Sequence, residues 1–257
     1  MVLLHGFTNC WQAWRPVLPA LEARHDVFAP TLPGHLGGPS VDGGRAPIEA
    51  MVDVVEAQLD EQGIGRAHLV GNSLGGWLGL ELAVRGRALS VVAFCPAGGW
   101  EVGSREERAV YWYFWRASRI GVPLFRPFFR SLAKRPRLRA LAIGDMVSRP
   151  RQMNADLAFA TLQAASGCAI AGELLAASKG GELFGELGPI GCPVTVATAS
   201  GDRLFKGPPY FTKLRRLLPD ASWVELDGLG HQPMSDDPGL VSRVILEATA
   251  AASSNPY

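Results

Sequence analysis

A glycine-flanked serine turn, Gly71-Asn72-Ser73-Leu74-Gly75, is the feature that most constrains what this chain can fold into. An apolar run ends at Val70, just before the turn, and a stretch with helical character follows it. Strand, G-x-S-x-G and helix in this order predict a sharp bend with the serine hydroxyl exposed at its tip. The flanking glycines leave room for the chain to double back, and the helix N-terminus at Leu74 favours negative charge. The pattern indicates a nucleophilic serine, with a plain helix-capping serine as the alternative.

Short apolar runs alternate with helical patterns over most of the chain. We expect strands at residues 2–4, 26–29, 67–70, 90–94, 193–199 and 222–226. We expect helices at residues 14–24, 47–62, 77–84 and 208–218, and a last one capped by Asp236 or Asp237. Residues 30–45, rich in proline and glycine, should form a loop. This order predicts an α/β fold with a mostly parallel central sheet and helices on both faces.

The alternation stops near Gly98 and resumes near Pro193, and only helical patterns lie between. Aromatic side chains cluster in the first part of this segment. Between Trp100 and Arg151 the chain has 12 Lys and Arg against 4 Asp and Glu, a net charge of +8, whereas the rest carries −7. Such an asymmetry marks a segment built differently from its host. We therefore expect an α/β core of residues 1–97 and 190–257 with a helical insertion at 98–189.

The composition restricts the class of protein further. A chain of 257 residues with 47% hydrophobic residues suits one large globular α/β domain with an insertion, and a net charge of +1 gives no overall attraction to nucleic acid. The four cysteines form no C-x-x-C pair, so we expect free thiols in a reducing compartment and neither a metal nor another cofactor. No apolar run reaches 18 residues and the N-terminus does not read as a signal peptide. We therefore expect a cytoplasmic protein without a transmembrane segment.

Groups suited to acid–base and nucleophilic chemistry follow three of the predicted strands. Function in parallel sheets gathers at the carboxyl ends of the strands, where Ser73, Asp202 and His231 are placed. Of the five histidines, His231 is the one in a glycine-rich loop after a strand and downstream of a strand-end carboxylate. Asp227 also ends a strand but leaves only three residues before His231, so it is the less suitable acid. Serine, aspartate and histidine in this order are far more specific than the serine turn alone.

The chain resembles the α/β-hydrolase fold family over nearly its whole length. The resemblance is carried by His5-Gly6-Phe7, Pro33-Gly34-His35, Gly71-Asn72-Ser73-Leu74-Gly75, Ser200-Gly201-Asp202 and Gly230-His231. It implies that Ser73 is the nucleophile, that His231 is the base taking its proton, and that Asp202 orients the imidazole. It further implies an oxyanion hole formed by the backbone N–H groups of Phe7 and Leu74, and that residues 98–189 form a cap.

Family members catalyse several reactions, and the residues present narrow the choice. Epoxide hydrolases and haloalkane dehalogenases carry aspartate at the nucleophile position, and Ser73 argues against both. Hydrolases of carbon–carbon bonds in ring-cleavage products usually carry tryptophan soon after the catalytic histidine, where this chain has Gln232. We therefore predict a carboxylesterase or lipase-like enzyme acting on small-molecule esters of apolar acyl or aryl groups. A carbon–carbon hydrolase and a ligand-binding receptor remain the alternatives, and the natural substrate stays open.

The start of the chain departs from the family pattern. Members usually have a two-stranded hairpin before the strand that leads to His-Gly, but only four residues precede His5. Either the hairpin is missing or the true start lies upstream of Met1. An exposed sheet edge on the predicted strand 26–29 would then favour a homodimer. His5 and His35 are expected to be structural, and Asp145 a solvated helix end.

Overall fold

The computed structural model describes residues 1–42, 47–181 and 183–254, and within them the predicted α/β fold is confirmed. The central sheet has five strands in the order β1-β2-β3-β4-β5, and every neighbouring pair is parallel. The strands are β1 (Val2–Leu4), β2 (Ala67–Asn72), β3 (Ala88–Phe94), β4 (Val194–Ala199) and β5 (Ser222–Leu226). Three of them are almost wholly buried, as expected for a sheet covered on both faces.

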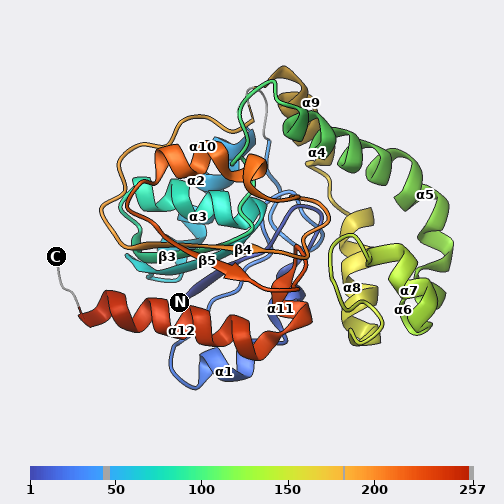
Figure 1. The fold of residues 1–257 in the computed structure, drawn as a ribbon, viewed down its shortest axis with the longest axis horizontal. Helices are drawn as coiled ribbons and strands as arrows, with labels where there is room; N and C mark the ends of the chain where they lie inside the picture. The colour runs from blue at the N-terminus through green and yellow to red at the C-terminus, as the bar shows by residue number, and fades with distance from the viewer. Residues whose placement is uncertain (43–46, 182, 255–257) are drawn as a thin grey trace.

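Helices pack on both faces of the sheet (Figure 1). One face carries α2 (Pro47–Glu61), α3 (Leu74–Val84) and α10 (Thr212–Leu217), and the other carries α1 (Leu18–Glu22) and α12 (Pro238–Ser254). The short elements η4 (Pro208–Phe211) and α11 (Pro233–Asp236) precede α10 and α12. The predicted apolar stripe of α2 is buried along its whole length, and Trp14, Trp77 and Phe94 are fully enclosed in the main core.

Two predicted elements near the N-terminus are wrong in extent. Residues 26–29 form no strand but a single bridge, in which Leu3 N donates to Phe28 O and Phe28 N donates to Met1 O, both at 2.9 Å. The predicted helix 14–24 is divided into η1 (Trp11–Trp14) and α1, because Pro19 lacks the N–H that an uninterrupted helix needs and instead sits in the first turn of α1. Dimerisation through this sheet edge stays a prediction. Of the expected loop 30–45, residues 43–46 lie outside the described part.

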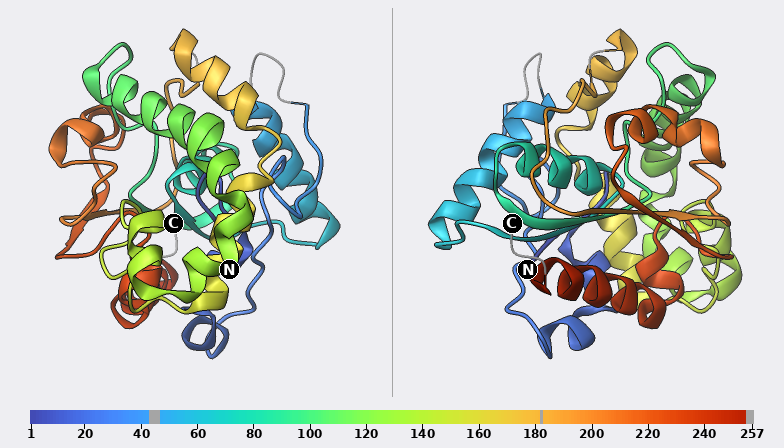
Figure 2. Two further views of the ribbon diagram at one scale, coloured as in Figure 1. Left: turned by 90° about the vertical axis from the view of Figure 1, so that its right-hand side faces the viewer. Right: turned by 60° about the vertical axis from the view of Figure 1, so that its left-hand side comes forward.

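The segment between β3 and β4 contains helices and no strand among residues 98–181 and 183–189. It forms a layer at one end of the sheet (Figures 1 and 2). Its elements are α4 (Arg105–Arg116), a π-helical turn η2 (Ala117–Gly121), α5 (Val122–Phe125), η3 (Arg126–Phe128), α6 (Phe129–Lys134), α7 (Pro136–Ile143), α8 (Ala155–Ser166) and α9 (Ala171–Gly180).

These helices pack in two different ways. Apolar side chains of α4 and α9, including Phe114 and Leu174, belong to the main hydrophobic core. Helices α6 to α8 instead share a separate cluster that includes Phe129, Ile143 and Leu157. In the described part of the chain no single helix is long and apolar enough to cross a membrane; α8 and α9 meet that test only as a pair bent by 65°.

Candidate active site

The turn between β2 and α3 places Ser73 in a strained backbone conformation. Ser73 has φ 53° and ψ −114°, a region that non-glycine residues rarely occupy. A Cβ atom on Gly71 would lie 2.1 Å from the carbonyl oxygen of Gly75, and one on Gly75 would lie 2.1 Å from the carbonyl oxygen of Leu4. Both glycines of the G-x-S-x-G pattern are therefore required by close backbone approach.

Hydrogen bonds from neighbouring segments hold this strained residue. The N–H of Ser73 donates to Phe94 O at 2.9 Å, and its carbonyl oxygen accepts from Ala97 N at 3.0 Å. Leu74 is the first residue of α3, where backbone N–H groups have no partner inside the helix. The N–H dipoles of α3 therefore stabilise negative charge close to the serine.

Asp202 and His231 form a buried, hydrogen-bonded pair. The Nδ1 atom of His231 lies 2.7 Å from Oδ2 of Asp202, and each side chain is only 1% exposed. The other carboxylate oxygen of Asp202 accepts hydrogen bonds from Leu204 N at 2.7 Å and Phe205 N at 2.8 Å. The loop after β4 thus fixes the carboxylate, and the carboxylate fixes the imidazole with Nε2 directed away from it.

The alternative acid, Asp227, has a different partner. Its Oδ1 accepts a hydrogen bond from Ser200 Oγ at 2.9 Å, and the same Ser200 oxygen accepts from Gly228 N at 2.8 Å. Asp227 is exposed and serves this surface turn. The structure therefore pairs His231 with Asp202 rather than with Asp227.

The His231 loop is joined to the serine turn. Asn72, the residue before Ser73, donates from Nδ2 to the carbonyl oxygen of His231 at 2.8 Å. Phe205 contacts the His231 ring edge-to-face, with 4.5 Å between ring centroids, and lines the same cavity as Ser73. The Nε2 atom of His231 is buried and has no hydrogen-bond partner within the described residues. An imidazole held in this way can accept a proton from a hydroxyl beside it.

Asp236, which the sequence offered only as a possible helix cap, is a structural member of the site. Its carboxylate accepts from the backbone N–H groups of Gly230 at 2.8 Å, Ser148 at 2.9 Å and Arg149 at 2.7 Å. It thereby ties the His231 loop to the segment between β3 and β4. Its neighbour Asp237 caps α12, accepting from Leu240 N at 2.9 Å, which decides between the two capping candidates.

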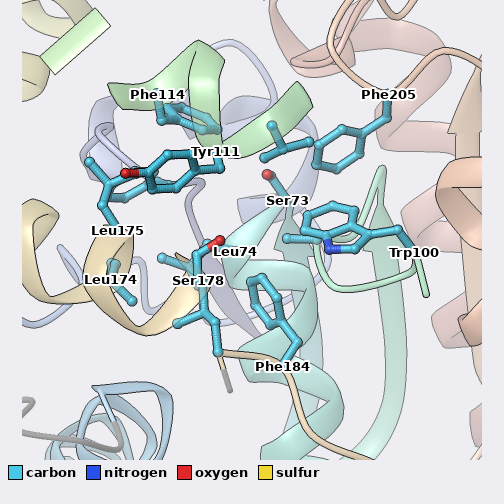
Figure 3. Close-up of a pocket in the computed structure, with 14 residues that line it drawn as sticks. Ser73, Leu74, Trp100, Tyr111, Phe114, Leu174, Leu175, Ser178, Phe184 and Phe205 are labelled. Carbon is cyan, nitrogen blue, oxygen red and sulfur yellow. The ribbon is translucent and has the colours of Figure 1, made fainter. Parts of the chain in front are cut away.

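An apolar cavity opens in front of Ser73, whose hydroxyl oxygen points into it (Figure 3). Phe7 and Leu74, the two predicted oxyanion donors, line it together with Ser73. The remaining wall comes from Ala97, Trp100, Val110, Tyr111, Phe114, Leu174, Leu175, Ser178, Leu183, Phe184 and Phe205. The cavity is narrow, with a volume of about 40 Å³. The lining suits an apolar group in contact with the serine.

The two histidines expected to be structural are buried and hydrogen-bonded to the backbone. His5 Nε2 accepts from Leu32 N at 2.9 Å, so it holds the loop after β1 against the following loop. Burial, and the neighbouring His35, lower the pKa of His5 well below 6.5. Burial also lowers the pKa of His35 to about 4, so both rings are neutral near pH 7. Asp145 is exposed, as expected.

One group of side chains has donor atoms close enough to be considered for a metal. Ligand atoms of Cys95, Asp202 and His231 lie within 4.8 Å of one another. However, the His231 Nδ1 and the Asp202 carboxylate already share a hydrogen bond, and a metal ion on the same atoms would displace its proton. Burial and the nearby Asp202 raise the pKa of the Cys95 thiol well above 9, so it lacks the thiolate that a metal needs. This group fits proton chemistry better than metal binding.

Comparison with known proteins gives the same assignment of the fold. The model of the alpha/beta hydrolase family matches residues 1–244. The chain is 34% identical over 204 residues to the epoxide hydrolase EphH of Mycobacterium tuberculosis, covering 76% of this chain and 91% of that protein. It is 29% identical over 249 residues to a pimeloyl-[acyl-carrier protein] methyl ester esterase of Aromatoleum aromaticum, covering 93% of each chain.

Among solved structures, a thermophilic esterase from Thermogutta terrifontis superposes with a TM-score of 0.72 at 22% identity, covering 98% of this chain and 89% of the other. That likeness concerns the fold, whereas the family match extends over most of the sequence. The chain belongs to the α/β-hydrolase family.

Proposed function

We propose that this protein is a serine hydrolase of carboxylic esters in which Ser73, His231 and Asp202 act as nucleophile, base and orienting acid. The observation that carries the proposal is the buried His231–Asp202 pair, whose Nε2 has no partner among the described residues and which lies beside a strained serine turn. Serine is a weak nucleophile unless a base removes its proton. The pair supplies such a base, and the Ser73 hydroxyl, which points into the adjoining cavity, would be its proton donor.

The geometry supports a two-step reaction. Ser73 Oγ attacks the ester carbonyl carbon while its proton passes to Nε2 of His231, and the backbone N–H groups of Phe7 and Leu74 stabilise the resulting oxyanion. The intermediate collapses, the alcohol leaves with the proton from His231, and an acyl group remains on Ser73. Water, deprotonated by His231, then releases the acid and restores the hydroxyl. Asp202 stabilises the imidazolium that forms in each step.

Apolar acyl or aryl esters are the substrate class that the cavity favours. Six aromatic side chains line it, namely Phe7, Trp100, Tyr111, Phe114, Phe184 and Phe205, and no charged side chain of the described residues does. A buried hydrocarbon chain gains free energy there, whereas a charged acyl group would lose its hydration without a partner. One relative is named as a methyl ester esterase, which agrees with ester chemistry.

Serine at the turn argues against epoxide opening, although another relative is named as an epoxide hydrolase. A carboxylate that attacks an epoxide forms an ester, and water can then cleave that ester. An attack by Ser73 would instead form an ether, and the groups around Ser73 offer no means of hydrolysing it. An epoxide would therefore modify Ser73 once as a stable ether, and no further turnover would follow.

We further propose that residues 98–189 act as a cap over Ser73. Side chains of α4 and α9 supply most of the cavity wall opposite the serine. Figure 3 shows Tyr111 and Phe114 on one side of the Ser73 hydroxyl and Trp100 and Phe184 on the other. A lid of this kind excludes water and so strengthens the oxyanion contacts.

Turnover of p-nitrophenyl esters tests the proposed function. We expect the wild-type chain to hydrolyse them and Ser73→Ala to lose about 10⁶ in kcat, as for comparable serine nucleophiles. Ser178→Ala is the matched control, because Ser178 also lines the cavity but its hydroxyl has no hydrogen-bond partner among the described side chains. Hydrolysis of a vinylogous diketone without ester turnover would indicate a carbon–carbon hydrolase. Binding without turnover of either would indicate a receptor.

A further inference from the structure

The outer edge of the helical segment carries an unusual run of exposed apolar side chains. Of the ten large hydrophobic residues exposed in the described part of the chain, seven lie between residues 102 and 141. Pro123 to Phe128 are exposed without interruption, and within this run the exposed fractions are 61% for Leu124, 48% for Phe125 and 58% for Phe128. Single exposed apolar residues are ordinary, but a contiguous group marks an interaction surface.

Positive charge surrounds this run. Residues 116–139 contain eight Lys and Arg and no Asp or Glu. Arg139 is buried and donates to three backbone carbonyl oxygens, so it serves the fold. The other seven are exposed, and none of them forms an ion pair with a described residue. The cations therefore face solvent without neutralisation by the protein.

We call Arg119, Leu124, Phe125, Arg126, Phe128 and Arg130 the α5 ridge. It lies in the helical layer on the side away from the sheet, and Figure 2 (left) turns this side toward the viewer. The ridge is distinct from the cavity of Ser73, because none of its residues lines that cavity.

A large groove lies beside the ridge. Its volume is about 780 Å³, and its lining is almost entirely apolar. Ile120, Phe125 and Leu141 are both exposed and part of its wall, so the groove is continuous with the exposed surface. Arg116 and Asp145 are its only charged lining residues within the described chain. A groove of this size and polarity has room for a hydrocarbon chain.

These features indicate the kind of partner that the α5 ridge binds. Exposed Leu and Phe side chains beside several guanidinium groups suit an interface whose outer layer is anionic and whose interior is apolar. Nucleic acid offers the anions but would leave the apolar side chains without a desolvated partner. Guanidinium groups pair with phosphate in a bidentate manner, and the field of an anionic leaflet attracts each of them.

We propose that the α5 ridge docks the protein on an anionic lipid bilayer. Leu124, Phe125 and Phe128 insert among the acyl chains, and Arg119, Arg126 and Arg130 pair with lipid phosphates. The adjacent groove takes an acyl chain that enters between α4 and α7. Docking in this way is peripheral and reversible, and it does not depend on the reaction at Ser73.

Co-sedimentation with phosphatidylcholine vesicles, with and without phosphatidylglycerol, tests the proposal on the full chain. We expect binding to the vesicles that contain phosphatidylglycerol, with affinity falling as salt is added. Arg119→Gln/Arg126→Gln/Arg130→Gln should reduce the partition coefficient about 100-fold, from roughly fivefold per charge. Leu124→Ser/Phe125→Ser/Phe128→Ser should reduce it at least tenfold.

Two triple variants provide matched controls. Arg15→Gln/Arg24→Gln/Arg243→Gln removes the same charge from exposed positions outside the ridge, and Trp11→Ser/Leu36→Ser/Leu89→Ser removes the other three exposed large hydrophobic residues. Both should bind vesicles like the wild type. Circular dichroism of all variants, and turnover of a water-soluble short-chain ester by the ridge variants, should match the wild type.

Three results would overturn the proposal. The first is equal binding to vesicles with and without phosphatidylglycerol, and the second is undiminished binding by either ridge variant. The third is a dimer, seen by light scattering, that the ridge substitutions abolish while vesicle binding persists. The ridge would then be a contact between copies of this chain. Because vesicle binding needs no turnover, failure of this proposal and failure of the proposed hydrolase activity are separate results.

Discussion

Polar side chains around Ser73 are bonded to protein partners, whereas most cationic side chains on the outer helices of segment 98–189 face solvent. In the core, Asp202, Asp236 and Asn72 have their side chains bonded to named partners, and glycines are enclosed by backbone. On the outer helices, seven cations are exposed without an ion pair among the described residues, and large apolar side chains face solvent. We propose that the core holds the reacting groups in place and that the helical segment contacts substrates and partners.

The largest expected effect in the core is the loss of kcat on replacing the carboxylate that pairs with His231. Asp202→Asn should lower kcat by about 10⁴, because the amide can hold the imidazole in the wrong tautomer. Asp227→Asn, the control, removes only a surface hydrogen bond to Ser200, so its kcat should remain near that of the wild type. The measurement is kcat of both variants on one p-nitrophenyl ester. A larger loss in Asp227→Asn would reverse the assignment.

Replacing one glycine in the core and one in the helical segment by alanine tests how tightly each region is packed. Gly71→Ala should destabilise the protein by at least about 3 kcal/mol, because its Cβ would overlap the backbone of Gly75. Gly172→Ala in α9 meets nothing within 4 Å and should stabilise by up to about 1 kcal/mol through helix propensity. Urea unfolding of both variants gives the two values. Equal destabilisation would show that the helical segment is packed as tightly as the core.

The buried histidines should make the core sensitive to mild acid. The unfolded state takes up protons near pH 6.5, whereas burial lowers the pKa of His35 to about 4, so the unfolded state binds more protons between these values. The free energy of unfolding should therefore fall as pH falls through this window, by about 1.6 kcal/mol from pH 6.5 to 5 for His35 alone. Urea midpoints measured from pH 7 to 5 should show this slope, and His35→Gln should reduce it. An unchanged slope in that variant would contradict the account.

The smallest expected effect is on acyl-chain selectivity, which depends on the cavity residues that the helical segment supplies. Each CH₂ that the cavity buries should raise kcat/KM about fourfold until the space is filled. Leu175→Ala should shift the optimum to longer chains, because Leu175 lines the cavity. Leu141→Ala, which is 84% exposed and lies outside that cavity, should leave the optimum unchanged. A profile from acetyl to dodecanoyl esters that is flat, or that moves equally in both variants, would remove the helical segment from substrate selection.

The difference between local and long-range contacts explains how much of the fold and of the site the sequence could predict. The serine turn, the buried strands and the Asp202–His231 pairing were accessible, because each rests on local periodicity or on a strand end. The bridge at Phe28 was overestimated as a strand, because an apolar run cannot tell one hydrogen-bonded pair from several. Asp236 was missed in its main role, since its partners Ser148 and Arg149 are far away in the chain.

Phe205 and the α5 ridge show a second limit of sequence patterns. Phe205 contacts His231 only because the loop after β4 folds back, and no local signal predicts that contact. The aromatic residues between Trp100 and Phe129 could be recognised as a cluster, but the sequence could not separate Phe114, which is buried, from Phe128, which is exposed. The α-helical pattern is interrupted at η2 and η3, so side chains on either side of these turns do not follow one common helical periodicity.

Covalent labelling tests directly whether Ser73 is the nucleophile. The intact protein would be treated with a fluorophosphonate carrying an alkyl chain and then digested and sequenced by mass spectrometry. We expect one adduct, on Ser73, formed quickly in the wild type, slowly in Asp202→Asn and not at all in Ser73→Ala. An adduct on another serine, or esterase activity that survives complete modification of Ser73, would contradict this assignment.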